Sequence, residues 1–274
     1  MPTIMPNLTF EEALEITKIH SIAGELKEDL ITKRPFRSPH YTVSTSSLIG
    51  GGRIPKPGEI SLAHYGVLFL DELPEFNRAS LEVLRGPLED RKVTISRVAT
   101  TVTYPSNFML IASMNPCECG YYSSDLKKCT CNQKAIKRYV SKISGPILDR
   151  IDLHIEVKPV EYEKLSVHNQ IENSKNIKQR VDKARSVQLK RYKELGIFCN
   201  AELDSNLFDK FCQLDKKSRD IMSMAFERYG LSARAHDKIL KIARTIADLD
   251  DSENIQYKHI AEAIQYRSLD TKYF

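Results

Sequence analysis

The feature that most constrains the fold is a short apolar run that ends in two adjacent carboxylates. Residues 66–72 read Gly-Val-Leu-Phe-Leu-Asp-Glu. An unbroken run of this length, rich in Val, Leu and Phe, is typical of a parallel strand covered on both faces. Ligands of such sheets bind at the carboxyl ends of the strands. The run therefore predicts an α/β fold with Asp71 and Glu72 at a ligand-binding edge.

Two roles remain open for this pair of acids. One carboxylate could hold a phosphate-bound Mg²⁺ while the other faces a water molecule, because the side chains of successive strand residues point to opposite sides. Alternatively, both acids could simply end the strand and cap the next helix. The neighbouring motifs must decide between these interpretations.

Several further elements of the first 160 residues follow from capping and alternation. Thr9, with Glu12 three residues later, predicts a helix that ends near Gly24. Four prolines and the triplet Gly50-Gly51-Gly52 predict a long structured insertion or loop at residues 34–59, and a loop of this length usually has a function of its own. The other predictions are a helix at 80–90 broken early by Gly86-Pro87, a β-hairpin from 93–96 and 101–104, and strands at 108–113 and 151–157.

The strand signals stop beyond about residue 160, so we predict an all-helical second part. Its first helix, at about 171–193, is amphipathic and carries many lysines and arginines. We place the boundary between the two parts within 158–170. Further helices are predicted at 203–214, 216–229, 233–249 and 257–266.

Composition excludes some classes of protein. A hydrophobic fraction of 41% and a charged fraction of 28% are those of a globular chain, and no apolar run could cross a bilayer. The start of the sequence does not read as a secretory signal, so we expect a cytoplasmic protein without a membrane partner. The net charge of +5 permits contact with nucleic acid but does not demand it. The segment 123–148 is locally basic, although a solvated helix face explains this charge more simply.

Four of the cysteines form two close pairs. Cys117 and Cys119 are followed after nine residues by Cys129 and Cys131. This arrangement predicts a Cys₄ zinc site, although one residue separates the cysteines of each pair instead of the commoner two. Reduced structural thiols or a redox pair are the alternatives.

Polar residues at four positions complete a pattern when taken together. The Asp-Glu pair follows one strand, Asn115 follows the next, Arg150 precedes the predicted strand at 151–157, and Arg234 opens a helix. In this order they resemble the AAA+ ATPases.

A closer resemblance extends over essentially the whole chain, to the YifB/ComM family of magnesium-chelatase-like AAA+ proteins. The segments that carry it are Arg34-Pro-Phe-Arg-Ser-Pro-His40, Ile49-Gly-Gly-Gly52, Pro57-Gly-Glu-Ile-Ser-Leu-Ala-His64, Leu81-Glu-Val-Leu-Arg85, Pro87-Leu-Glu-Asp90, Met114-Asn-Pro-Cys117 and Leu148-Asp-Arg-Ile-Asp-Leu-His154.

The resemblance implies ATP and Mg²⁺ as cofactors and a role for each polar residue. Asp71 would hold Mg²⁺ and Glu72 would polarise the attacking water. Asn115 would orient that water or touch the γ-phosphate. Arg150 would reach in from a neighbouring subunit, and Arg234 would report the γ-phosphate to a lid. For both arginines, a structural ion pair is the alternative.

One motif of the family does not occur in the sequence. AAA+ proteins cradle phosphate in a loop of the form G-x-x-x-x-G-K-[ST], and this chain contains no such segment. The resemblance places the loop just before Pro2. We therefore expect residues 1–160 to be an AAA+ core without its first strand and phosphate loop, residues 161–274 to be a helical lid, and this chain alone to be inactive.

The resemblance implies a motor that acts on DNA. In full length it would be a ring, with six subunits expected, that acts as a helicase or branch-migration factor in recombination or natural transformation. Arg37, Arg53 and Arg97 would face the central pore and touch the nucleic-acid backbone. A chelatase-type motor that remodels a protein partner is the first alternative, and a non-catalytic interaction fragment is the second.

Overall fold

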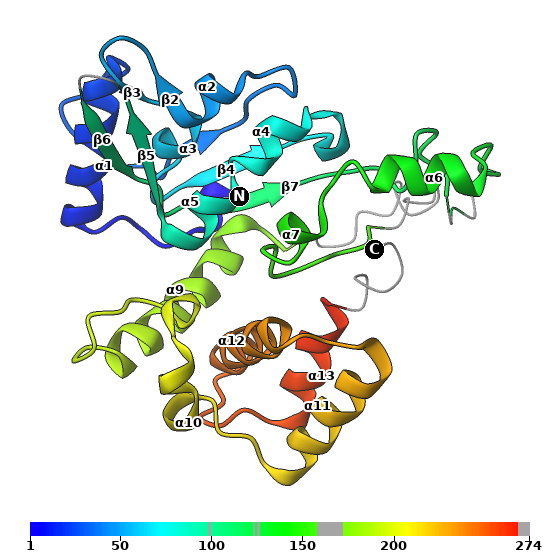
Figure 1. Cartoon of the computed structure of the whole chain (residues 1–274). Helices are drawn as coiled ribbons and strands as arrows, with labels where there is room; N and C mark the ends of the chain where they lie inside the picture. Colours follow the sequence, from blue (N-terminus) through cyan, green and yellow to red (C-terminus); the bar gives the residue numbers. More distant parts are fainter. Residues whose placement is uncertain (98–99, 123, 125–126, 158–171, 268–274) are drawn as a thin grey trace. The chain divides into compact units, whose positions relative to one another are not determined.

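The structure, a computed structural model, describes all residues except 98–99, 123, 125–126, 158–171 and 268–274 (Figure 1). The chain divides into two compact units. Unit 1 contains Met1–Pro2 and Asn7–Arg150, and unit 2 contains Thr3–Pro6 and Ile151–Phe274. Unit 1 has a parallel sheet and unit 2 is helical, which confirms the predicted α/β class with a helical carboxyl-terminal region. The boundary predicted within 158–170 lies outside the described residues and stays a prediction.

The parallel sheet of unit 1 has the predicted apolar run at its centre. Strand β4 (Val67–Leu70) lies between β1 (Phe36–Arg37) and β7 (Met109–Ala112), and both pairings are parallel. Val67, Leu68 and Leu70 are fully buried. The strands predicted at 66–72 and 108–113 are therefore confirmed.

Strand β1 was not predicted, because residues 34–59 were interpreted as a loop. Its pairing with β4 depends on a close backbone approach at Gly66. A Cβ at this position would lie 2.1 Å from the carbonyl oxygen of Pro35, so only glycine fits. The same segment also contains α2 (Thr45–Ile49), and α3 (Glu59–Leu62) begins at its end.

Helix α1 (Phe10–Ala23) begins and ends as the sequence predicts. The Thr9 hydroxyl accepts from the Glu12 backbone N–H at 3.2 Å, and the Glu12 carboxylate accepts from the Thr9 N–H at 2.9 Å. Gly24 ends the helix in the left-handed conformation with φ +80°. Ala13, Ile16 and Ile19 bury one face of this helix in the core of unit 1.

Two antiparallel hairpins lie side by side in unit 1 (Figure 1). One pairs β2 (Gly50–Gly51) with β3 (Lys56–Pro57), and the other is the predicted hairpin of β5 (Lys92–Ser96) and β6 (Thr101–Pro105). The Tyr104 hydroxyl of the second donates to the Pro55 carbonyl of the first at 2.7 Å. This contact fixes the base of the β5–β6 hairpin against the turn of the β2–β3 hairpin.

The predicted helix at 80–90 is two helices, α4 (Arg78–Glu82) and α5 (Arg85–Asp90). The prediction that Gly86-Pro87 breaks it was wrong, since the interruption lies at Val83 and Leu84. Pro87 lies in the first turn of α5, where its missing N–H leaves no intrahelical bond unmade. The remaining short helices of unit 1 are the 3₁₀ turn η2 (Leu73–Glu75), α6 (Gln133–Val140) and α7 (Gly145–Leu148).

The strand predicted at 151–157 is absent from the described structure of that segment. Alternation alone does not make a strand, because a ladder needs a partner, and no described strand pairs with these residues. The His154 N–H donates instead to the Tyr266 carbonyl at 2.8 Å. The side chains of Leu153, Ile155 and Val157 are exposed.

Within its described residues, unit 2 consists mainly of four helices around one apolar core. Three predicted helices agree closely with α11 (Lys216–Tyr229), α12 (Ala233–Leu249) and α13 (Tyr257–Gln265), and α9 (Ser174–Arg191) is the basic helix. Tyr192, Ile239 and Ile260 are fully buried at its centre. Within the described residues, no helix is long and apolar enough to cross a membrane.

The helix predicted at 203–214 is confirmed only in part, because helical turns occupy residues 205–211 and a separate 3₁₀ turn lies just before them. They are η3 (Asn200–Glu202), η4 (Ser205–Leu207) and α10 (Phe208–Phe211). The Asp204 carboxylate accepts from the Asn206 N–H at 2.9 Å, and this local bond stabilises a turn in place of a continuous helix. A further turn, η1 (Pro2–Ile4), lies near the start of the chain.

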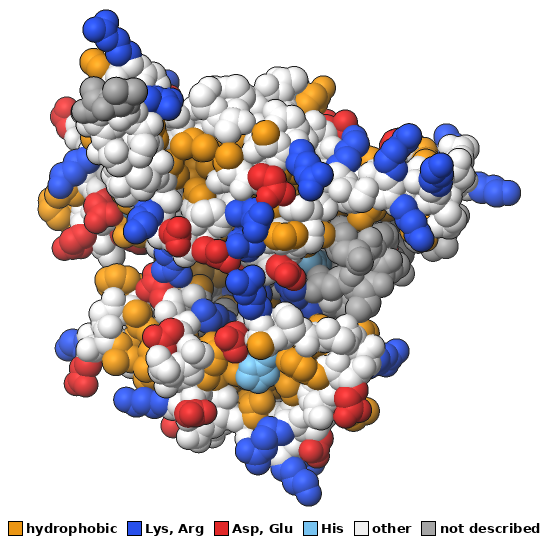
Figure 2. All heavy atoms as spheres, in the orientation of Figure 1, with side chains coloured by type: hydrophobic (Ala, Val, Ile, Leu, Met, Phe, Trp, Pro, Cys, Tyr) orange, Lys and Arg blue, Asp and Glu red, His pale blue; other side chains and the backbone are white. Residues whose placement is uncertain are grey.

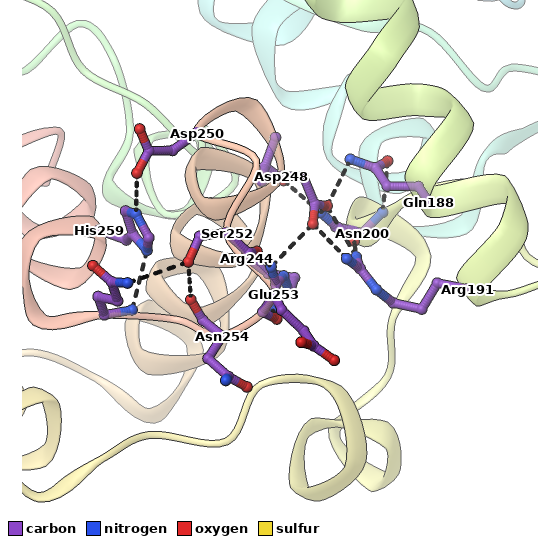
Figure 3. A network of polar contacts seen from close by, with 12 residues as sticks. Gln188, Arg191, Asn200, Arg244, Asp248, Asp250, Ser252, Glu253, Asn254 and His259 are labelled. Carbon is purple, nitrogen blue, oxygen red and sulfur yellow. Dashed lines mark hydrogen bonds and ion pairs between the residues drawn. The ribbon is translucent and has the colours of Figure 1, made fainter.

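A buried carboxylate holds the helices of unit 2 together (Figure 3). The Asp248 side chain is fully buried, and Arg191 of α9 donates to both of its oxygens at 2.5 and 2.9 Å. Arg244 lies 3.1 Å from the same carboxylate, and Asn200 donates to it at 2.8 Å. Burial lowers the pKa of Arg191, but its hydrogen bonds to Asp248 outweigh this effect, so the net pKa is raised.

Candidate functional site

The predicted acids lie at the carboxyl end of the central strand. The Asp71 carboxylate accepts a hydrogen bond from the Glu72 N–H at 3.0 Å and contacts the Ser113 hydroxyl. Ser113 follows β7 just as Asp71 follows β4, because Leu70 pairs with Ala112. Our sequence reasoning missed Ser113, which the strand register would have indicated.

Glu72 does not continue the strand. Its backbone is left-handed, with φ +54° and ψ +48°, so the predicted strand alternation of the two side chains was wrong. Such a conformation is uncommon for a residue other than glycine and is found more often at functional sites. The Glu72 side chain forms no capping bond to η2. The structure therefore gives no support to the helix-cap interpretation of Glu72.

Asn115 lies just beyond β7 and is exposed. Its side chain forms no hydrogen bond within the described part of the chain. Its backbone contacts Tyr139, whose pKa is raised mainly by burial and also by the nearby Glu75 carboxylate, while the Asn115 bond opposes the rise. Asn115 is therefore held near the sheet edge through its backbone, with its side chain left for other contacts.

The donor atoms at this edge suit a hard divalent cation. Carboxylate and hydroxyl oxygens are the ligands that Mg²⁺ takes, and the Asp71 carboxylate and the Ser113 hydroxyl lie together here. The sequence contains no glycine-rich phosphate loop. The described residues therefore fit the metal-binding side of a nucleotide site but not its phosphate cradle.

The two predicted arginines of the ATPase site lie in different units. Arg150 donates to the Pro146 carbonyl at 2.6 Å and forms an ion pair with Glu89 at 2.6 Å, with 11% of its side chain exposed. This chain therefore uses Arg150 as an internal ion pair, and its action on a neighbouring subunit stays a prediction. Arg234 is exposed in the first turn of α12, two residues after the capping residue Ser232 in the sequence.

Two of the three arginines predicted to touch nucleic acid lie on neighbouring hairpins. Arg53 lies in the turn of the β2–β3 hairpin and Arg97 at the end of β5, and both are exposed. The Arg97 guanidinium reaches the first hairpin, where a Cβ at Gly51 would lie 3.1 Å from it. The structure thus brings two predicted contact elements together.

Arg37 is instead neutralised within unit 1. Its guanidinium donates to both Glu59 oxygens, at 2.6 and 2.7 Å, and to Glu25 at 2.9 Å. The hydrogen bonds to Glu59 raise the pKa of Arg37. With two carboxylates beside it, this side chain offers little net positive charge to a phosphate.

The four paired cysteines form one cluster, with all four sulfur atoms within 4.8 Å of one another. Three of the sulfur–sulfur distances are 3.4, 3.5 and 3.8 Å. A tetrahedral zinc site requires about 3.8 Å between sulfurs, because each Zn–S bond is about 2.3 Å long. The cluster therefore fits Zn²⁺ as the predicted Cys₄ set.

The thiols of the cluster differ in their affinity for protons. Hydrogen bonds from the backbones of Tyr121 and Thr130 lower the pKa of Cys119 to about 5. Loss of solvation and the neighbouring sulfurs raise the pKa of Cys129 to about 12. The protein backbone thus favours one thiolate, whereas further thiolates need a bound cation.

Replacing Cys117 with serine is expected to lower the bound zinc from one ion per chain to less than about 0.2, because three ligands hold the ion far more weakly than four. Elemental analysis of the protein purified without chelator measures the ratio. Cys199→Ser is the matched control, since Cys199 lies outside the cluster. A zinc-free wild-type protein that is fully folded would contradict the zinc hypothesis.

Comparison with known proteins gives two family matches that together cover most of the chain. The profile described as magnesium chelatase, subunit ChlI, matches residues 1–165, and that of the subunit ChlI C-terminal region matches residues 171–267. YifB of Escherichia coli, named as uncharacterised, is 44% identical over 97% of this chain and 52% of its own length. The competence protein ComM of Haemophilus influenzae is 41% identical over the same shares. The chain thus spans about half the length of the curated relatives it matches.

Proposed function

Because this chain belongs to the magnesium chelatase subunit ChlI family, as a homologue of YifB and ComM, we propose that it is part of an ATP-driven motor that acts on DNA. The experiments that test this proposal use what we call the full-length protein, a chain of the relatives' length that includes a phosphate-binding loop. Branch migration or strand separation is the proposed work of this motor, and a ring of subunits its proposed form.

The acids beyond β4 support the hydrolytic half of the proposal. Asp71, beside the Ser113 hydroxyl, offers oxygen ligands to Mg²⁺. Glu72 follows directly and makes no helix-capping bond, so its carboxylate is available to polarise a water molecule. ATP, when bound, supplies the phosphoryl group that this water would attack.

The paired hairpins are the observation that carries the DNA half of the proposal. Arg53 and Arg97 are exposed on two neighbouring hairpins, and Ile54, beside Arg53, is 79% exposed. Exposed guanidinium groups bind backbone phosphates without regard to base sequence. An exposed apolar residue next to Arg53 would suit contact with a base or sugar. One relative also carries the name competence protein.

Replacing both Arg53 and Arg97 with alanine in the full-length protein is expected to reduce the salt dependence of DNA binding. Each lost phosphate contact lowers the slope of log K against log salt concentration by about 1, so the double variant should lose about 2. Fluorescence anisotropy of labelled single-stranded and branched DNA at several NaCl concentrations measures the slope.

The matched control removes two exposed arginines from another helix, α11, in the variant Arg219→Ala/Arg228→Ala. Its slope should equal that of the wild type. Wild-type protein that does not bind DNA at low salt would refute the DNA half of the proposal and favour a motor that remodels a protein partner.

A further inference from the structure

A second basic surface lies in unit 1, on α6 and the loop that leads into it. Between Cys117 and Lys142 the sequence has six basic residues against Glu118 and Asp125. Lysine and arginine side chains gather over α6, at the right of Figure 2. In Figure 1 the arginine hairpins lie at the opposite end of unit 1. The two basic surfaces are therefore separate.

Helix α6 has one face in the core and the other in solvent. Ile136, Tyr139 and Val140 are buried. The exposed face carries Lys134, Lys137 and Arg138, which we call the α6 basic face. Residues three and four apart lie one above the other on a helix, so these three charges form a stripe.

The charges of this stripe are little used within the protein. Neither Lys134 nor Lys137 forms an ion pair in the described part of the chain, and Arg138 lies 3.6 Å from Glu118 with 74% of its side chain exposed. An exposed ion pair at this distance contributes little to stability. The α6 basic face therefore offers positive charge that internal folding does not require.

The cysteine cluster connects the helix that carries this stripe to a loop segment with an exposed aromatic residue. Cys131 immediately precedes Asn132, whose side chain accepts from the Ala135 N–H at 2.8 Å and begins α6. Between the two cysteine pairs in the sequence, the Lys127 ammonium lies 4.8 Å from the ring centre of the exposed Tyr121. A metal held by the four sulfurs would thus connect the loop to the start of the helix.

From this arrangement we infer that the α6 basic face, together with Tyr121 and Lys127, forms a second contact surface for the DNA backbone, with its geometry held by the metal. Lysines and arginines in a row bind successive phosphates, and a neighbouring tyrosine ring can stack on an unpaired base. The aromatic ring favours a nucleic acid over an acidic protein, because a base can stack on the ring whereas a carboxylate cannot. This inference rests on the proposed action on DNA.

The test compares wild-type full-length protein with the triple variant Lys134→Ala/Lys137→Ala/Arg138→Ala. Its control is Lys216→Ala/Lys217→Ala/Arg219→Ala, which removes the same charges from the exposed face of α11. Anisotropy of labelled single-stranded DNA is measured from low to high NaCl. Zinc content and thermal unfolding establish that each variant is folded.

We expect the triple variant to keep its zinc, to lose about 2 to 3 from the salt slope, and to bind DNA at least about tenfold more weakly at low salt. The control should match the wild type. As a second measurement, Cys129→Ser should weaken DNA binding although the basic residues remain.

Equal slopes for the triple variant and its control, with the wild type binding DNA, would overturn the inference and leave the proposed function intact. A triple variant that loses binding to polyglutamate but not to DNA would also overturn it, in favour of an acidic protein partner. If the wild type binds no DNA, the proposed function fails, and this inference fails with it.

Discussion

Glu72→Gln in the full-length protein is expected to lower ATP hydrolysis by about 100- to 10,000-fold and to leave ATP binding unchanged. Glutamine has the size of glutamate but cannot accept a proton, and a positioned general base contributes a rate factor of this order. The strain of the left-handed backbone at residue 72 is the same in both proteins, because glutamate and glutamine have the same shape. Steady-state hydrolysis and a nucleotide titration measure the two quantities separately.

Glu75→Gln is the matched control for this experiment. Glu75 is an acid three residues away, and its carboxylate forms an exposed ion pair with Lys142 at 3.1 Å. Its replacement should change the hydrolysis rate by less than about twofold. If the two variants hydrolyse ATP at similar rates, Glu72 is not the base and the proposed site is wrong.

Asp248→Ala is expected to lower the free energy of unfolding of unit 2 by about 3–5 kcal/mol. Removing one partner of a buried ion pair leaves the other charge buried without compensation. In this variant two largely buried arginine side chains would lose their carboxylate partner, since the Arg244 side chain is 3% exposed and the Arg191 side chain is 17% exposed. Asn200 would lose a hydrogen bond as well. Urea unfolding, followed by far-UV circular dichroism, measures the change.

The control for the buried carboxylate is Asp182→Ala in α9. Asp182 pairs with Lys178 at 3.2 Å on the outer side of the helix, and 43% of its side chain is exposed. An exposed pair of this kind contributes at most about 1 kcal/mol. Equal urea midpoints for the two variants would mean that the Asp248 network does not hold the helices of unit 2 together.

Local sequence signals predicted the elements whose boundaries have local causes. The bond between Thr9 and Glu12 begins α1, and Gly24 ends it, within the same stretch of chain. The helices α11 and α12 follow capping residues, Asp215 and Ser232, that the sequence displays directly before them. The cysteine cluster was predictable because its ligands lie within 15 residues of one another.

Elements that depend on distant partners could not be predicted in this way. Strand β1 has only two residues and exists because Gly66 lets the chain at Pro35 approach closely. The alternating segment 151–157 has the pattern of a strand, but within the described residues it has no ladder partner. The hydrophobic pattern of a segment indicates that it could form a strand, whereas strand pairing also requires a second segment beside it.

The candidate sites show the same division. Asp71 and Glu72 were found from one apolar run, but Ser113 lies 42 residues from Asp71 in the sequence. The partners Gln188, Arg191 and Asn200 lie 60, 57 and 48 residues from Asp248. No spacing rule connects such residues. Only the packing of α9 and η3 against α12 brings them to one carboxylate.

The contact between the two hairpins has a consequence for how a strand of DNA would be released. The Tyr104–Pro55 bond holds the base of the β5–β6 hairpin against the turn of the β2–β3 hairpin, and the Arg97 guanidinium lies beside Gly51, so Arg53 and Arg97 belong to two hairpins that are held together. A phosphate that leaves one arginine remains close to the other, at a high effective concentration. If the protein acts on DNA as proposed, rebinding to the second arginine would then be faster than escape. Two such contacts would let a motor exchange its phosphate contacts one at a time without dissociating from the DNA strand.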